Sequence, residues 1–240
     1  MQKKEFVTRY NHLAEAERLE RLPVPRAFVL QQIGRGKRVL DVGCQGGQFS
    51  RQIMDRNNEV WGVELNAEAA ELARERGIRV KVADVEEGLP FESASFDVVN
   101  AGEMLERIYD TKLFLDECNR VLKPDGTLIF TAPNLNSLEN RFRVLAGGYL
   151  AMSGAYPEDH YGEHIRIFNL AKLRELCGAT GFRFVEVRGV PTLKPKGRWI
   201  DIPLERASRL WPSLAKVLIV KVRKNAGPGR SGGLRAVPKF

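Results

Sequence analysis

Short apolar runs alternate with amphipathic stretches along most of this chain. The runs are rich in Val, Leu and Ile, which is typical of strands buried on both faces of a sheet. The stretches between them place apolar residues at helical spacing. The pattern predicts strands over 38–42, 59–64, 78–83, 96–100 and 126–132 and helices over 5–22, 26–33, 47–57, 67–76 and 110–122. This alternation predicts an α/β fold with a mostly parallel sheet and helices on both faces.

The first strand-to-helix junction is rich in glycine. Residues 37–50 read KRVLDVGCQGGQFS, an apolar strand followed by a carboxylate and a cluster of glycines. Glycine allows a sharp turn with φ > 0, and it lets a ligand approach the main chain without meeting a Cβ. The junction therefore predicts a ligand cradle. Glycine loops of this kind also occur in dinucleotide folds, in phosphate loops and in plain tight turns.

Acidic residues end the next two strands and separate these alternatives. Glu64 lies about twenty residues beyond the turn, where a doubly wound sheet places a carboxylate that accepts hydrogen bonds from ribose hydroxyls. Asp84 ends the third strand. No Lys-Ser or Lys-Thr pair follows the glycines, as a phosphate loop requires, and the GxGxxG of nicotinamide dehydrogenases is missing. The sequence thus predicts a nucleoside ligand.

These motifs, in this order, resemble those of the class I S-adenosylmethionine-dependent methyltransferases. VLDVGCQGG is similar to their glycine motif, Glu64 to the ribose acid, and Asp84 to the residue facing the adenine amine, while FDVVNAGEMLERI follows from Phe96. The resemblance runs from Val39 to Phe184. It implies that S-adenosyl-L-methionine is the cofactor. The cofactor-binding residues that it implies are Asp41, Gly43, Cys44, Gln45, Gly47, Glu64, Leu65, Asp84 and Val85.

The resemblance also completes the expected fold. The family sheet has two further strands, the last of them antiparallel, and these correspond to 182–188 and 216–222. We therefore expect a doubly wound, mostly parallel seven-stranded sheet within a single domain over 1–224. Three additions are expected: an N-terminal helical lid over 1–33, a substrate cap over 134–168, and a disordered basic tail over 225–240.

One residue of the glycine loop departs from the family pattern. The family usually has glycine where this chain has Gln45, and we expect the neighbouring Gly46 to take the left-handed dihedral instead. Arg107 is a second departure, because relatives with a pattern like xEVLEHV have histidine there and this chain reads GEMLERI. The two substitutions keep open an alternative, a non-catalytic module that binds the cofactor or a partner protein.

His164 and Glu103 are the candidate catalytic residues. Methyl transfer to oxygen needs a positioned, deprotonated nucleophile, and the pKa range of histidine suits proton removal near neutral pH. Relatives have a stretch similar to that around His164 on the substrate side, although His164 could instead fix its loop, and His160 is a weaker second candidate. Because Arg107 replaces histidine, Glu103 and Glu106 predict a poor metal site, and no metal is expected.

Composition and cysteine usage fit a single cytoplasmic domain. The 240 residues are 43% hydrophobic and 28% charged, as in ordinary globular proteins. The first residues lack the apolar core of a signal peptide, and no apolar stretch approaches the ~18 residues that cross a bilayer. Cys44, Cys118 and Cys177 lack metal-ligand spacing, so reduced thiols are expected, with Cys44 a packing residue.

The excess positive charge lies near the C-terminus, and it affects which kind of binding partner is expected. Residues 181–240 carry 14 Lys and Arg against 3 Asp and Glu, whereas residues 1–180 carry 24 against 27. With Trp199 and Trp211 interleaved among these cations, peripheral membrane contact is one interpretation, and packing against the sheet is the other. The NPPY-type tetrapeptide of nucleic-acid base methylators is replaced by NAGE, so nucleic acid is a disfavoured partner.

Within the family, the overall pattern is most similar to methyltransferases of small molecules, lipids and glycans. These include the ubiquinone-pathway O-methyltransferases and, to a lesser degree, the MetW-like proteins of methionine biosynthesis. The predicted function is O-methylation of a small-molecule, glycan or lipid-like acceptor. A nucleic-acid or protein methyltransferase is the remaining alternative.

Overall fold

The computed structural model describes residues 26–150, 164–190 and 210–225. The predicted helix over 5–22, His160, Trp199 and all but the first residue of the predicted tail lie outside these ranges.

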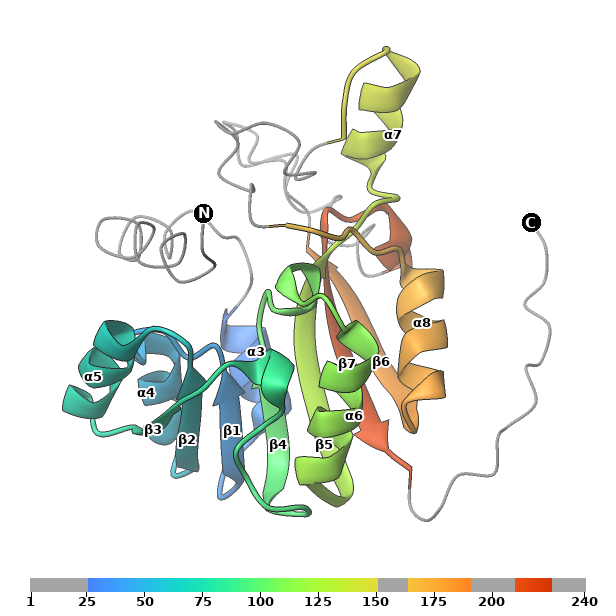
Figure 1. Cartoon of the computed structure of the whole chain (residues 1–240). Coiled ribbons are helices and arrows are strands. Elements are labelled where there is room, and N and C mark those ends of the chain that lie inside the picture. Colours follow the sequence, from blue (N-terminus) through green and yellow to red (C-terminus); the bar gives the residue numbers. More distant parts are fainter. Residues whose placement is uncertain (1–25, 151–163, 191–209, 226–240) are drawn as a thin grey trace.

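The core of the protein is a sheet of seven strands (Figure 1). The strand order is β3-β2-β1-β4-β5-β7-β6, and β7 runs antiparallel to both β5 and β6, while the pairs among β1 to β5 are parallel. The strands are β1 (Arg38–Val42), β2 (Glu59–Glu64), β3 (Arg79–Val82), β4 (Phe96–Ala101), β5 (Leu122–Pro133), β6 (Phe182–Val190) and β7 (Val217–Lys224). The predicted doubly wound sheet with an antiparallel last strand is confirmed.

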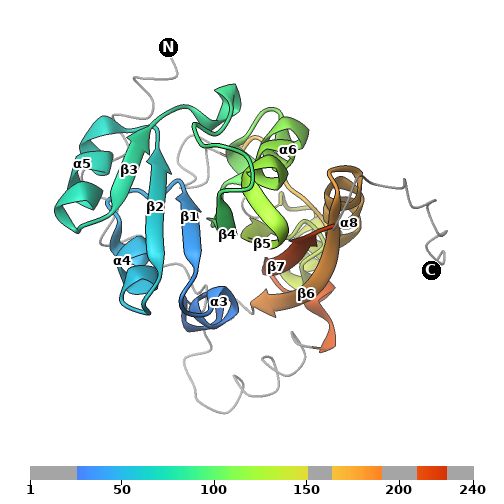
Figure 2. The same ribbon diagram turned by 90° about the horizontal axis from the view of Figure 1, so that it is seen from below.

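Helices cover both faces of this sheet (Figure 2). The helices on the two faces are α3 (Arg26–Ile33), α4 (Gln48–Met54), α5 (Ala67–Glu75), α6 (Thr111–Val121) and α8 (Leu170–Ala179), while α7 (Leu138–Leu145) lies beyond the strand ends. Alternate residues of one strand supply the two faces: Val39 packs with the side chains of α3, α4 and α5, whereas Leu40 packs in the cluster that holds α6 and α8. Because successive side chains of a strand point to opposite faces, the buried residues of β1 contribute to both apolar layers.

Side-chain caps fix where several helices begin. The Asn66 side chain accepts a hydrogen bond from the Ala69 N–H at the start of α5, and Asp110 accepts one from the Leu113 N–H at the start of α6. Such caps satisfy main-chain donors that the first helical turn leaves unbonded. Because α5 begins just after β2 and α6 begins where the loop 102–110 after β4 ends, the caps also help to position the loops at the carboxyl ends of those strands.

Helix α7 projects beyond the carboxyl ends of the strands (Figure 1). It follows β5 and begins after Ser137, whose hydroxyl accepts a hydrogen bond from the Asn140 N–H. In open α/β sheets ligands bind at this end of the strands. The projecting helix therefore stands on the side of the molecule that carries the candidate site.

Candidate functional site

The glycine turn between β1 and α4 forms with three residues in the left-handed region. Gly43 has φ 69°, Gly47 has φ 79°, and Gln45 has φ 49°. A Cβ on Gly43 would lie 2.6 Å from the Met104 sulfur, and one on Gly47 would lie 2.8 Å from Ala73 Cβ, so neither position has room for a side chain. The expectation that Gly46 takes the left-handed dihedral is wrong, because Gln45 itself adopts it.

Gln45 is tolerated there because its side chain points outward. It is exposed, whereas Gly46 and Gly47 are buried. A non-glycine residue in this conformation bears a modest steric cost and no clash with the core. The departure from the family pattern therefore does not prevent the turn, and it gives no support to the non-catalytic alternative.

Asp41 lies beneath the turn. Its carboxylate accepts hydrogen bonds from Ser50 Oγ at 2.5 Å and from Asn100 Nδ2 at 2.7 Å, and the residue is 4% exposed. Burial raises the pKa of the Asp41 carboxyl above its ordinary value of 3.8, against the effect of these two hydrogen bonds, which lower it. Asp41 thus ties β1 to α4 and β4 and holds the turn from below.

Glu64 ends β2 beside the same turn. Its Oε2 accepts a hydrogen bond from the Gln45 N–H at 2.9 Å, and its Oε1 accepts one from the Asn66 N–H at 3.0 Å. Each oxygen of an ionised carboxylate can accept more than one hydrogen bond, so capacity for a ligand hydroxyl remains. Leu65, the next residue, is half-buried.

Asp84 occupies the corresponding place after β3. Its Oδ1 accepts a hydrogen bond from the Glu86 N–H at 3.1 Å and so caps a short 3-10 helix, Val85–Glu87. The Val85 side chain is buried in the core, while Asp84 is half-buried. The structure therefore gathers the predicted residues at the carboxyl ends of β1, β2 and β3, on one edge of the sheet.

Cys44 packs against the neighbouring strand. Its sulfur would lie 2.5 Å from a Cβ placed on Gly62, and its side chain is buried. All three cysteines are buried and none forms a disulfide, and burial raises the pKa of the Cys177 thiol to about 12. The Cys177 thiol is therefore a poor nucleophile at neutral pH, while the close approach of Cys44 to Gly62 is a packing contact.

The loop after β4 carries the predicted catalytic Glu103. The Glu103 N–H donates a hydrogen bond to Thr131 Oγ1 of β5 at 2.8 Å, and Glu103 has φ 56°. Met104, the next residue, lies against Gly43 of the glycine turn. The loop is therefore fixed to β5 on one side and contacts the glycine turn on the other.

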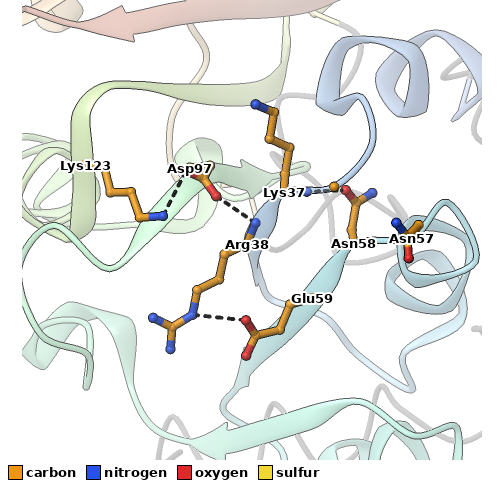
Figure 3. Close-up of a pocket in the computed structure, with 8 residues that line it drawn as sticks. Lys37, Arg38, Asn57, Asn58, Glu59, Asp97 and Lys123 are labelled. Carbon is orange, nitrogen blue, oxygen red and sulfur yellow. Dashed lines mark hydrogen bonds and ion pairs between the residues drawn. The ribbon is translucent and has the colours of Figure 1, made fainter.

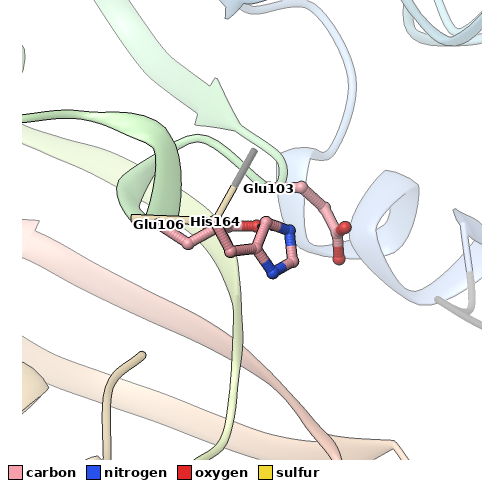
Figure 4. Close-up of side chains that lie close together, drawn as sticks. All are labelled: Glu103, Glu106 and His164. Carbon is pink, nitrogen blue, oxygen red and sulfur yellow. The ribbon is translucent and has the colours of Figure 1, made fainter. Parts of the chain in front are cut away.

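His164 lies beside this loop although it is far away in the sequence. The N–H groups of Ile165 and Arg166 both donate to the main-chain oxygen of Glu106, at 2.9 and 3.2 Å. This pairing places His164 Nε2 3.7 Å from Glu106 Oε1, with both side chains buried. Glu103, Glu106 and His164 form one cluster, and each offers a ligand atom within 4.8 Å of the others (Figure 4).

The cluster revises the sequence-based view of this loop. Glu103 and Glu106 were expected to make a poor metal site because Arg107 replaces a histidine, but His164 supplies an imidazole from another part of the chain. Two carboxylates and an imidazole are groups that can take up a proton or hold a cation. Sequence reasoning did not predict that Met104 would lie against the glycine turn or that Glu106 would lie beside His164, since no local signal reports either contact.

A hollow lies at the end of the sheet opposite the glycine turn, and Figure 3 shows the residues that line it. It has a volume of about 520 Å³, and its lining includes the first residues of β1 and β2. Its charged groups bind one another: Asp97 accepts from Lys123 Nζ at 2.9 Å and from the Arg38 N–H at 2.8 Å. Because ligands of open α/β sheets bind at the other end of the strands, this hollow is not the cofactor site.

Comparisons with known proteins identify the family. A model described as a methyltransferase domain matches residues 40–130. The chain is 32% identical over 161 residues to the ubiquinone biosynthesis O-methyltransferase of Paraburkholderia phymatum, covering 65% of this chain and 68% of that protein. It belongs to the class I S-adenosylmethionine-dependent methyltransferases. The predicted enzyme class and the predicted cofactor are thereby confirmed.

Other relatives of this methyltransferase agree. The enzyme of the same name from Alkalilimnicola ehrlichii is 33% identical over 136 residues, and the chain spans 55% of its length. A SAM-dependent methyltransferase of Thermotoga maritima has the same fold, with 21% identity, a TM-score of 0.63 and coverage of 92% of this chain and 97% of that one. The 1,6-didemethyltoxoflavin-N1-methyltransferase of Burkholderia thailandensis, solved with S-adenosylhomocysteine, has 20% sequence identity and a TM-score of 0.63. The match covers 92% of this chain and 86% of that one.

The residues present fit the cofactor. Gly43 and Gly47 leave no space for side chains at the turn, and the Glu64 carboxylate is held next to the turn by main-chain donors. Ribose hydroxyls need such an acceptor. Within the described ranges, no helix is long and apolar enough to cross a membrane.

Proposed function

We propose that this methyltransferase transfers the methyl group of S-adenosyl-L-methionine to a hydroxyl oxygen of a small-molecule, glycan or lipid-like acceptor. The observation that carries the proposal is the Glu103–Glu106–His164 cluster, which lies one residue from the Met104 contact with the glycine turn. Relatives named as ubiquinone biosynthesis O-methyltransferases support an oxygen acceptor.

The reaction is an in-line displacement at the methyl carbon. The acceptor oxygen forms a bond to that carbon, the carbon–sulfur bond breaks, and its electron pair stays on sulfur, so the sulfonium becomes a neutral thioether. The hydroxyl proton goes to His164, whose imidazole the buried Glu106 carboxylate orients. Glu103, at the half-exposed side of the cluster, positions the hydroxyl. His164 and Glu103 are thus the proposed catalytic residues.

The proposed cofactor contacts follow the strand ends. Glu64 binds the ribose and Asp84 faces the adenine amine, with Leu65 and Val85 as the residues that follow each acid. The turn residues Gly43, Cys44, Gln45 and Gly47 approach the cofactor through their main chain, and Asp41 supports them from below. The segment 134–168 is the proposed substrate cap on a single domain of 1–224, with the lid over 1–33 and the tail over 225–240 as additions.

Exposed apolar side chains near the site support a lipid-like acceptor. Phe142 and Leu145 of α7 are 64% and 83% exposed, and Leu210 and Trp211 are 71% and 59% exposed. The two groups lie on neighbouring segments, because Lys216 Nζ is 3.4 Å from Glu139 Oε2 of α7. Together with the cationic C-terminal region, they support peripheral contact of a cytoplasmic protein with a membrane that holds the acceptor.

Isotopically labelled cofactor tests the proposed function. The protein is incubated with labelled S-adenosylmethionine and fractionated cell extract, and the products are identified by mass. We expect an oxygen-linked labelled methyl group on a small molecule, glycan or lipid. His164→Ala should lose turnover and keep cofactor binding, whereas the surface change Glu175→Gln on α8 should keep both. Label only in nucleic acid or protein would contradict the proposal.

A further inference from the structure

The cluster of Glu103, Glu106 and His164 has the composition of a metal site. We propose that it binds one divalent transition cation of the Mn²⁺ or Zn²⁺ type, with an open coordination position for the acceptor oxygen. Binding of the cation stands on the cluster alone. Its use in catalysis rests on the proposed function, because an oxygen acceptor must reach the open position.

The distances fit a cation with little rearrangement. Ligand atoms around a cation with bonds of about 2.1 Å lie roughly 3 to 4 Å apart. His164 Nε2 and Glu106 Oε1 are 3.7 Å apart, and the candidate ligand atoms of all three residues lie within 4.8 Å of one another. Glu103 is the most accessible of the three, so its side chain has the most room to adjust toward the other two.

Two segments of the chain, the loop after β4 and the residues around His164, hold the ligands in place. Glu103 follows β4 and is fixed by the hydrogen bond from its N–H to Thr131 Oγ1. Glu106 lies in a short 3-10 helix, Leu105–Arg107, and its main-chain oxygen accepts the N–H groups of the two residues after His164. The same main-chain contacts therefore set the spacing of Glu106 and His164, as a preorganised site requires.

The charges of the cluster also favour a cation. The side chains of Glu106 and His164 are 0% and 1% exposed. The two carboxylates bring negative oxygen ligands within reach of one cation, at a place where two of the three side chains are removed from water. A divalent cation bound there balances the charge of ionised carboxylates and takes an imidazole nitrogen as its third ligand.

The mixed ligand set indicates which cations bind. Ca²⁺ and Mg²⁺ prefer oxygen ligands alone, whereas Zn²⁺ and related transition ions accept imidazole together with carboxylate. Three protein ligands leave a position open, which is the arrangement of catalytic rather than structural zinc sites. The open position lies on the side of Glu103, since Glu106 and His164 are buried.

A bound cation changes how the acceptor is activated. A hydroxyl oxygen at the open position loses its proton to water more readily, because the cation stabilises the oxyanion. The His164 nitrogen that binds the cation cannot accept the proton at the same time. With the cation bound, His164 therefore acts as a ligand, and it is the proton acceptor only in the cation-free protein.

Mn²⁺ binding tests the site without any acceptor. The full chain is treated with a chelator and dialysed, and Mn²⁺ is then titrated while the electron paramagnetic resonance signal of the free ion is recorded. We expect saturable binding of one Mn²⁺ per chain, with displacement by Zn²⁺. Glu103→Gln and His164→Gln should each weaken it by more than about tenfold, and Glu175→Gln should leave it unchanged. S-adenosylmethionine binding by calorimetry confirms that each variant is folded.

The outcomes separate this inference from the proposed function. No binding at millimolar Mn²⁺ or Zn²⁺, or equal binding in the wild type and in both ligand variants, overturns the cation site and leaves cofactor binding and methyl transfer untouched. Once the acceptor is known, turnover that needs added Mn²⁺ or Zn²⁺ after chelation supports the catalytic role of the cation. Full turnover in the presence of chelator overturns that role.

Discussion

The main-chain N–H of Gln45 donates a hydrogen bond of 2.9 Å to Oε2 of Glu64. This bond joins the glycine turn after β1 to the end of β2. A main-chain hydrogen bond lies next to it, in which the N–H of Gly43 donates to the Val63 oxygen at 2.8 Å. Glu64, the proposed ribose acid, is therefore held in position without a ligand, and little ordering of this side chain is needed on binding.

Glu64→Ala should weaken S-adenosylmethionine binding strongly. The loss of two charge-assisted hydrogen bonds to the ribose corresponds to roughly 2–4 kcal/mol, measured by isothermal titration calorimetry. Glu75→Gln, on the exposed side of α5, is the control and should bind as the wild type does. Unchanged affinity in Glu64→Ala would remove the ribose assignment.

The effect of substitutions at Gln45 on thermal stability should depend on how well the new residue tolerates the left-handed conformation. Gln45→Gly relieves the steric cost of φ 49°, which is about 1 kcal/mol for this region, so thermal stability should rise or stay equal with cofactor affinity retained. Gln45→Val places a β-branched residue in the same conformation and should lower the melting temperature. Calorimetric melting of the two variants compares them, and a stable Gln45→Val protein would show that the turn has moved.

Asp41 should respond differently to two substitutions. Asp41→Ala leaves the Asn100 amide without an acceptor in a buried site, and we expect a loss of about 1–3 kcal/mol in the free energy of unfolding. Asp41→Asn keeps the shape and an acceptor oxygen, and it removes a buried carboxylate whose pKa burial raises. It should be at least as stable as the wild type at neutral pH, as measured by urea unfolding.

The same linkage gives the pH dependence of Asp41. A carboxyl whose folded pKa lies above its unfolded value binds protons more tightly in the folded state, so its contribution to stability increases as the pH falls through the folded pKa. Asp41→Asn should lack this increase. Parallel pH profiles of the wild type and Asp41→Asn would contradict the raised pKa.

Glu117 should show the opposite pH dependence. Its hydrogen bond with Arg120, at 2.6 Å, lowers the pKa of the Glu117 carboxyl below its ordinary value of 4.5, and Glu117 Oε2 also accepts the Leu89 N–H at 2.8 Å. The stability that it contributes is complete above pH 4.5 and is lost as the pH falls through the lowered folded pKa. In the Glu117→Gln variant, the free energy of unfolding should fall less as the pH is lowered through this range, as measured by circular dichroism.

Helix α7 should matter for membrane contact and not for stability. Replacing Phe142 and Leu145 by serine removes exposed apolar side chains, so the melting temperature should change little. Cosedimentation with phosphatidylglycerol vesicles should fall. Leu72→Ser, at a 43% exposed position on α5, is the matched control and should sediment as the wild type does. Equal sedimentation of the α7 variant would contradict a role of α7 in membrane contact.

Much of the fold follows from local sequence pattern, and the site follows only in part. Apolar runs and their spacing predict the strands, and the position of Glu64 after the glycine turn predicts its neighbourhood. Strand β5 begins at Leu122, earlier than its apolar pattern suggests, because Leu122 pairs with Phe96 of β4. That pairing is a tertiary contact, and the local composition does not report it.

The acceptor side depends still more on contacts between distant residues. His164 reaches Glu106 because two main-chain N–H groups bind the Glu106 oxygen. Nothing in the local pattern around His164 encodes this pairing. Likewise, the left-handed conformation of Gln45 follows from the bond that its N–H makes to Glu64, whereas composition alone favoured glycine for that role.

Asn134, which directly follows β5, contacts residues of two segments that lie far from it in the sequence. Its side chain donates to the oxygens of Ser213 and Ala215, at 2.8 and 2.7 Å, and its N–H donates to the Lys216 oxygen. It also forms a bridge with Phe168. The segment that leaves after Asn134 thus returns to the point where it began. Such a closed junction lets the intervening chain change in length or composition over evolution, and so acquire new acceptors, without disturbing the sheet that binds the cofactor.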